Sequence, residues 1–131
     1  MNINNIPKVV NEIANMANWT MTTFVRTYYF LKPHVIEQKV QALSRHRKVD
    51  AIYVTSEIDN PDMNHLHLAI AGRKLTREEV AEAMHINYYH VGNIESIRGK
   101  KQTIQYISKR LIRQDRYIDA YHNYFFNPKH K

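Results

Sequence analysis

The 131-residue chain contains no cysteine, which excludes disulfide bonds and thiolate zinc sites. This length predicts a single domain, residues 1–131, with a core of ordinary size. Its apolar runs are too short to span a bilayer and no secretory signal opens it, so we expect an intracellular protein without a membrane partner.

The formal net charge of +7 is distributed unevenly along the chain. Residues 1–97 carry ten Lys/Arg and ten Asp/Glu, whereas residues 98–131 carry nine Lys/Arg and two Asp, so the whole excess lies in the last quarter. This concentration favours a polyanionic partner, most simply nucleic acid. A solvated basic tail without a specific partner is the alternative.

The first half of the chain predicts alternating helices and strands. Apolar residues at helical spacing indicate a helix within residues 1–17, and β-branched and aromatic residues indicate a strand over 19–26. A second helix begins at Pro33. Strands over 51–57 and 65–70, joined by a polar turn, predict a hairpin.

The second half opens with the sequence of a capping box, Thr76-Arg77-Glu78-Glu79, and so with a third helix. Residues 89–97 predict a fourth strand, and Gly99 separates it from a helix over 101–113. A last helix is expected over 115–126, within the C-terminal segment 114–131. The pattern predicts an α+β domain, with helices packed on an antiparallel sheet.

Two histidines on the 65–70 strand indicate a metal site. Side chains alternate along a strand, so His65 and His67 share one face while Leu66 and Leu68 share the other. If the leucines face the core, Glu57 of the preceding strand lies on the histidine side. One carboxylate and two imidazoles suit Mn²⁺ or Mg²⁺ with open positions, and also Zn²⁺. Surface histidines that bind nothing are the alternative.

The helix over 101–113 carries a tyrosine away from its apolar side. Stepping about 100° per residue separates the core positions Ile104, Ile107 and Leu111 from Gln102, Tyr106, Lys109 and Arg113. The Lys109 ammonium, three residues after Tyr106, would favour phenolate and stabilise charge on an attacked phosphate. Tyr-x-x-Lys is also common by chance, so a surface tyrosine is the alternative.

The order of these motifs resembles the HUH endonuclease domain of replication-initiator (Rep) proteins, as in small circular single-stranded DNA viruses and related plasmids. The first family motif is matched by Trp19-Thr20-Met21-Thr22. The second is matched by His65-Leu66-His67 and the third by Tyr106-Ile107-Ser108-Lys109. Residues 91–101 also resemble the family's approach to its nucleophile helix.

The resemblance implies a ferredoxin-like fold and sequence-specific nicking and joining of single-stranded DNA. Tyr106 would attack a phosphodiester, giving a 5′-phosphotyrosine and a free 3′-OH, which starts rolling-circle replication. Glu57, His65 and His67 would hold Mn²⁺ or Mg²⁺. Expected DNA contacts are Thr20, Thr22, Arg26, Lys100, Lys101, Gln102 and Arg113.

The implied partners are an origin of replication in a stem-loop, a helicase or host replication proteins, and further copies of the chain. The implied location is the host nucleus for a eukaryotic virus and the cytoplasm for a prokaryotic virus or plasmid. No phosphate-binding loop is present, so we expect no helicase domain.

Several alternatives stay open. A non-catalytic ferredoxin-like nucleic-acid-binding module or a transposase-type HUH enzyme would share parts of the pattern. Tyr117 and Tyr121, four residues apart on the expected last helix, resemble the tyrosine pair of some relatives, but packing on the apolar side of that helix is the favoured interpretation.

Overall fold

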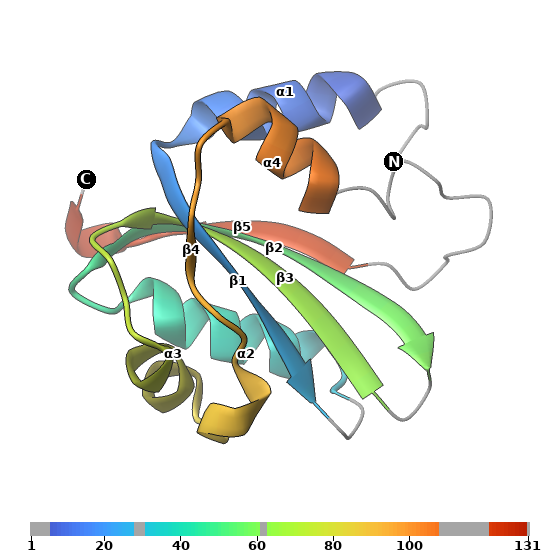
Figure 1. Ribbon diagram of the computed structural model, residues 1–131, viewed down its shortest axis with the longest axis vertical. Coiled ribbons are helices and arrows are strands. Elements are labelled where there is room, and N and C mark those ends of the chain that lie inside the picture. Colours follow the sequence, from blue (N-terminus) through green and yellow to red (C-terminus); the bar gives the residue numbers. More distant parts are fainter. Residues whose placement is uncertain (1–5, 28–30, 61–62, 108–120, 131) are drawn as a thin grey trace.

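The computed structural model describes residues 6–27, 31–60, 63–107 and 121–130 (Figure 1). At its centre lies an antiparallel five-stranded sheet with the order β4-β1-β3-β2-β5. The elements are α1 (Ile6–Met16), β1 (Trp19–Thr27), α2 (Pro33–Ser44), β2 (Val49–Asn60), β3 (Met63–Gly72), α3 (Arg77–Met84), the 3₁₀ helix η2 (Tyr88–His90), β4 (Glu95–Ser96), α4 (Lys100–Ile107), β5 (Tyr121–Phe126) and the 3₁₀ helix η3 (Pro128–His130).

The predicted ferredoxin-like α+β class is confirmed by this topology. From β1 to β4 the chain runs β-α-β-β-α-β, with α2 and α3 as its two helices. The extra strand β5 extends the sheet beyond β2. Within the described ranges, no helix combines the length and apolar character needed to cross a membrane.

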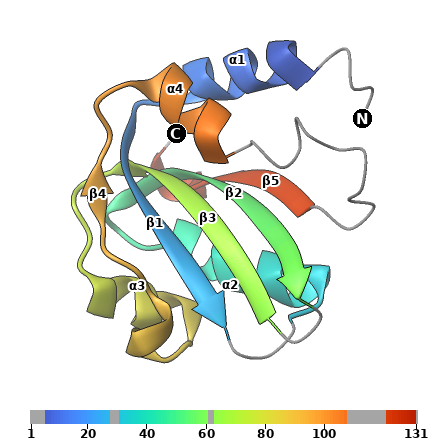
Figure 2. The same ribbon diagram turned by 45° about the vertical axis from the view of Figure 1, so that its right-hand side comes forward.

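Helices cover both faces of the sheet (Figures 1 and 2). On one face, α2 and α3 bury the leucines of β3 together with the apolar residues of β2 that alternate with Tyr53. On the other face, α1 and α4 lie together and pack through Ile13 and Ile104 against Trp19 and Tyr53. The Trp19 Nε1 atom donates a hydrogen bond to the Ile13 carbonyl at 2.8 Å, which fixes α1 to the start of β1. The metal-site prediction concerns this second face.

The regular periodic segments were predicted correctly. The N-terminal helix, the strand after it, the Pro33 helix, the β2–β3 hairpin and the capped α3 helix are all present. Leu66 and Leu68 are completely buried, while His65 and His67, which alternate with them, are half-buried. The period-two assignment of faces on β3 is therefore confirmed.

The predicted strand over 89–97 is largely wrong. Residues Tyr88–His90 form η2, Val91 makes a single bridge to Val25, and only Glu95 and Ser96 pair with β1 as β4. The Asn87 side chain accepts a hydrogen bond from the Tyr89 amide at 2.9 Å. This local bond favours a turn where the apolar and aromatic residues alone predicted an extended chain.

The predicted helix over 115–126 is wrong in its last six residues, which form β5 against β2. Phe125 packs on the α2 side of the sheet, whereas Tyr124 and Phe126 are exposed on the other side. Aromatic residues suit a half-buried strand, and pairing supplies the hydrogen bonds that β2 would otherwise lack. Tyr121 belongs to β5 rather than to a helix, and Tyr117 lies outside the described residues. The predicted helix over 101–113 is described as far as Ile107.

The capping box of α3 also joins this helix to the sheet. The Thr76 side chain accepts from the Glu79 amide at 3.1 Å, and Glu79 Oε1 accepts from the Thr76 amide at 3.0 Å. Lys48 Nζ lies 2.8 Å from the second carboxylate oxygen. The hydrogen bond from Lys48, followed by that from the Thr76 backbone, lowers the pKa of Glu79 from 4.5 to about 2.

We expect the Glu79→Gln variant to have an unfolding free energy that depends less on pH in the acidic range than that of the wild type. A carboxylate with a lowered pKa stabilises the fold above its unfolded pKa of about 4.3, and that contribution disappears as the pH falls towards 2. At pH 7 the variant should lose about 1–2 kcal/mol in urea denaturation, and less at pH 3. Glu82→Gln, at an exposed position of the same helix, is the control. An unchanged pH dependence in Glu79→Gln would contradict the assignment.

Candidate metal and nucleic-acid site

Two imidazoles lie side by side on the central strand β3. The ring centroids of His65 and His67 are 4.5 Å apart, with the planes tilted by 40°. They are close because residues two apart on a strand project from the same face. Phe24 of β1 lies opposite His67 in the register, and its ring meets that of His65 edge-on at 5.6 Å. The histidine pair is therefore set in a wall formed by two hydrogen-bonded strands.

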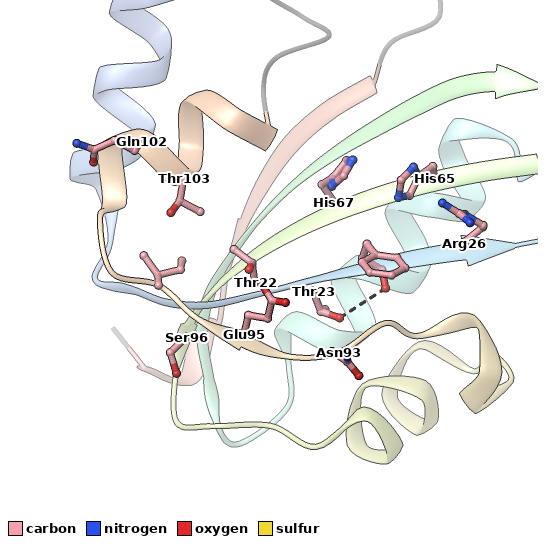
Figure 3. Close-up of a pocket in the computed structure, with 12 residues that line it drawn as sticks. Thr22, Thr23, Arg26, His65, His67, Asn93, Glu95, Ser96, Gln102 and Thr103 are labelled. Atoms are coloured by element: carbon pink, nitrogen blue, oxygen red, sulfur yellow. Dashed lines mark hydrogen bonds between the residues drawn. The ribbon is translucent and has the colours of Figure 1, made fainter.

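A cavity of about 560 Å³ opens in front of this wall (Figure 3). It brings together five of the residues predicted for the site: Thr22, Arg26, His65, His67 and Gln102. They come from β1, β3 and α4, which are far apart in the sequence. The structure thus brings these five residues to one cavity, and their predicted roles stay predictions.

The position of Glu57 agrees with the prediction as far as the backbone describes it. In the β2–β3 register, Glu57 is paired with His65 and Thr55 with His67. The side chain of Glu57 lies outside the described part, and among the side chains within that part no three His, Asp or Glu residues form a metal-ligating group. The carboxylate ligand of the predicted trio stays a prediction.

Helix α4 lies on the same face of the sheet and lines one side of the cavity. Its Gln102 and Thr103 side chains line the cavity, and its Ile104 is fully buried against the sheet. Residues three and four apart lie on one side of a helix. Position 106 is four residues after Gln102 and three after Thr103, but the side chain of Tyr106 lies outside the described part, so its place at the cavity stays a prediction. Lys109 and Arg113 lie outside the described residues.

Three further predicted DNA contacts, Thr20, Lys100 and Lys101, are described by the structure and do not line this cavity. Thr20 lies at a bulge between Trp19 and Met21, outside the cavity lining. The Thr20 hydroxyl donates to the Gly72 carbonyl at 2.9 Å. Lys100 and Lys101 are exposed in the first turn of α4, outside the cavity lining.

Sequence reasoning missed Phe24 and the β4 segment of the lining. Phe24 is 40% exposed, which is unusual for a large apolar side chain in the central part of a strand. Alternation along a strand places position 24 on the same face as Thr22 and Arg26, so the sequence could have predicted Phe24 as part of the lining. Asn93, Glu95 and Ser96 reach the cavity because β4 pairs with β1, which no local pattern predicted.

Comparisons with protein-family models, with curated proteins and with solved structures gave no match for this chain.

Proposed function

We propose that this protein is a metal-dependent endonuclease that nicks and rejoins single-stranded DNA through Tyr106, in the manner of HUH replication initiators. One observation supports the proposal: the His65–His67 pair lines a cavity that is also walled by α4, the helix that carries position 106. A phosphodiester between these walls would be within reach of both a metal platform and a nucleophile.

The donor set fits a divalent metal. Two imidazoles at 4.5 Å and a carboxylate residue paired with one of them offer nitrogen and oxygen ligands without thiolate. His65, His67 and Glu57 would hold Mn²⁺ or Mg²⁺, which when bound polarises a phosphate and positions it. These three residues are the ligand set that the resemblance to the HUH family implies, and no further described side chain is needed as a ligand.

The chain's own residues supply the remaining chemistry. The Tyr106 phenol loses its proton, and its oxygen attacks phosphorus to form a 5′-phosphotyrosine while the 3′-oxygen leaves and takes up a proton. The Lys109 ammonium favours the phenolate and offsets charge on the phosphate. Arg26, exposed at the cavity, suits a neighbouring phosphate. The ester bond is conserved in the adduct, so the reverse reaction rejoins the ends.

Rolling-circle replication of a circular single-stranded genome or plasmid is the process in which such an enzyme acts. Its partners would be an origin in a stem-loop and a helicase. The basic excess in residues 98–131 supports a DNA backbone as ligand, since phosphate contacts dominate such affinities.

The test is a covalent-adduct assay combined with calorimetry. Wild-type protein, labelled single-stranded oligonucleotides of varied sequence and Mn²⁺ should give a band that survives denaturing electrophoresis and disappears with chelator. His67→Ala should abolish the band and weaken Mn²⁺ binding at least about tenfold in calorimetry. His34→Ala, on an exposed turn of α2, should change neither.

The same experiment separates the enzyme from a non-catalytic binding module. Phe24 is 40% exposed at the cavity, and such a ring can stack on a base without any chemistry. A module of that kind would bind DNA in a salt-sensitive manner, give no adduct and be indifferent to chelator and to His67→Ala. That combination of results would overturn the proposed activity.

A further inference from the structure

Three cavities that share lining residues extend from the candidate site towards the other end of the sheet. The site cavity shares Glu95 and Ser96 with a cavity of about 180 Å³. The latter shares Thr20 and Gly72 with a cavity of about 700 Å³. The three openings thus follow β1 from its middle to its first residue, and the largest of them is the farthest from the histidines.

The far end of this path is rich in cations. Arg47 and Arg73 line the largest cavity and Lys74 lines the small one, and all three side chains are exposed. Together with Phe126, which also lines the largest cavity, they define what we name the basic end. Lys48 is nearby but is held by Glu79 at 2.8 Å.

The charge along the whole path favours a polyanion. Besides Lys48, which is paired with Glu79, the described residues that line the three cavities include the cations Arg26, Arg47, Arg73 and Lys74, against the two carboxylates Asp50 and Glu95. A groove with an excess of one sign raises the local concentration of the opposite sign. Nucleic acid is the polyanion that the neighbouring candidate site would already hold.

An aromatic pair at the basic end favours a single strand over a duplex. Phe126 is 46% exposed and Tyr124 is 45% exposed, with ring centroids 5.9 Å apart and planes at 71°. Exposed rings beside a basic groove stack on unpaired bases, which a duplex keeps inside its own stack. Neither ring is used by the proposed chemistry.

We propose that the basic end binds the single-stranded DNA that flanks the strand held at the candidate site. The inference deepens the proposed function and rests on it, because that function places DNA at the start of the path. Phe24 and Trp19 are five residues apart on β1, which is about 17 Å in a strand. At a stacked rise of about 3.4 Å, five nucleotides at most are needed to reach the basic end.

The test measures binding of the full-length protein to oligonucleotides of increasing length in metal-free buffer, by fluorescence anisotropy. Affinity should increase when about five nucleotides are added beyond the site, and this gain should fall about tenfold in Arg47→Gln/Arg73→Gln. The salt dependence of that double variant should fall by about 1.4 in its slope. Lys8→Gln/Lys32→Gln removes the same charge from exposed positions elsewhere and should keep the gain. Phe126→Leu should lose about fivefold or more.

Each outcome decides between the proposals. If long oligonucleotides bind both double variants equally, the basic end is not a DNA site, whether or not the wild type forms an adduct. If a duplex competes as well as a single strand, the assignment to single strands is wrong. If no adduct forms but the length-dependent gain depends on Arg47 and Arg73, the binding surface stands and the nuclease activity fails.

Discussion

Tyr106→Phe is expected to abolish the covalent protein–DNA adduct, with a loss of at least about a thousandfold in rate. The variant keeps the ring and removes only the phenol oxygen that would become bonded to phosphorus. Position 106 lies one helical turn after Gln102 and Thr103, which line the candidate cavity, so no other group of α4 is expected to replace it. Denaturing electrophoresis with Mn²⁺ and a labelled oligonucleotide measures the effect.

A control variant at a second tyrosine tests whether the effect is specific to Tyr106. Tyr89 is 82% exposed in η2, so Tyr89→Phe removes a hydroxyl without disturbing packing and should leave adduct formation unchanged. Binding of the oligonucleotide in metal-free buffer should be equal in both variants and the wild type. An adduct that persists in Tyr106→Phe, or mass spectrometry that places the DNA on another residue, would refute the assigned nucleophile.

Gly72→Ala is expected to destabilise the fold by about 3 kcal/mol or more. Gly72 ends β3 with φ at +146°, a conformation that residues with a Cβ rarely adopt. An added Cβ would also overlap the Lys48 carbonyl oxygen. That oxygen cannot move away freely, because it accepts a hydrogen bond from the Arg73 amide at 2.9 Å. Urea denaturation followed by circular dichroism measures the loss.

Gly99→Ala provides the comparison within the same chain. Its added Cβ would meet the amide end of the exposed Gln102 side chain, which can turn away into solvent. The change in unfolding free energy should therefore stay within about 1 kcal/mol. Equal losses at the two glycines would show that the fixed carbonyl beside Gly72 is not the cause.

The parts of the fold that were predictable are those in which one periodicity dominates. In β3, Leu66 and Leu68 alternate with His65 and His67, and burial follows the same alternation. In α3, Thr76 and Glu79 stand at the spacing that only a capped helix start requires. These signals are local, so they remain valid without knowledge of the neighbouring elements.

The remaining errors arise where distant pairing decides the outcome. The aromatic residues of β5 fit helical and strand periods equally well, and only the free edge of β2 selects the strand. The bulge between Trp19 and Met21 depends on how β1 pairs with β3. The alternation of β1 could have predicted Phe24. Glu95 could not be predicted in this way, because it reaches the cavity through its pairing with Thr22, which is 73 positions away in the chain.

The central position of β3 in the sheet affects how rigid the backbone is that carries His65 and His67. This strand has a hydrogen-bonded neighbour along each of its two edges, over nearly its whole length. Its backbone amides can then exchange with heavy water only when the sheet opens as a unit, on the timescale of global unfolding. The sheet therefore fixes the backbone at His65 and His67, so a ligand bound by this pair would have to order the two side chains and not the strand that carries them.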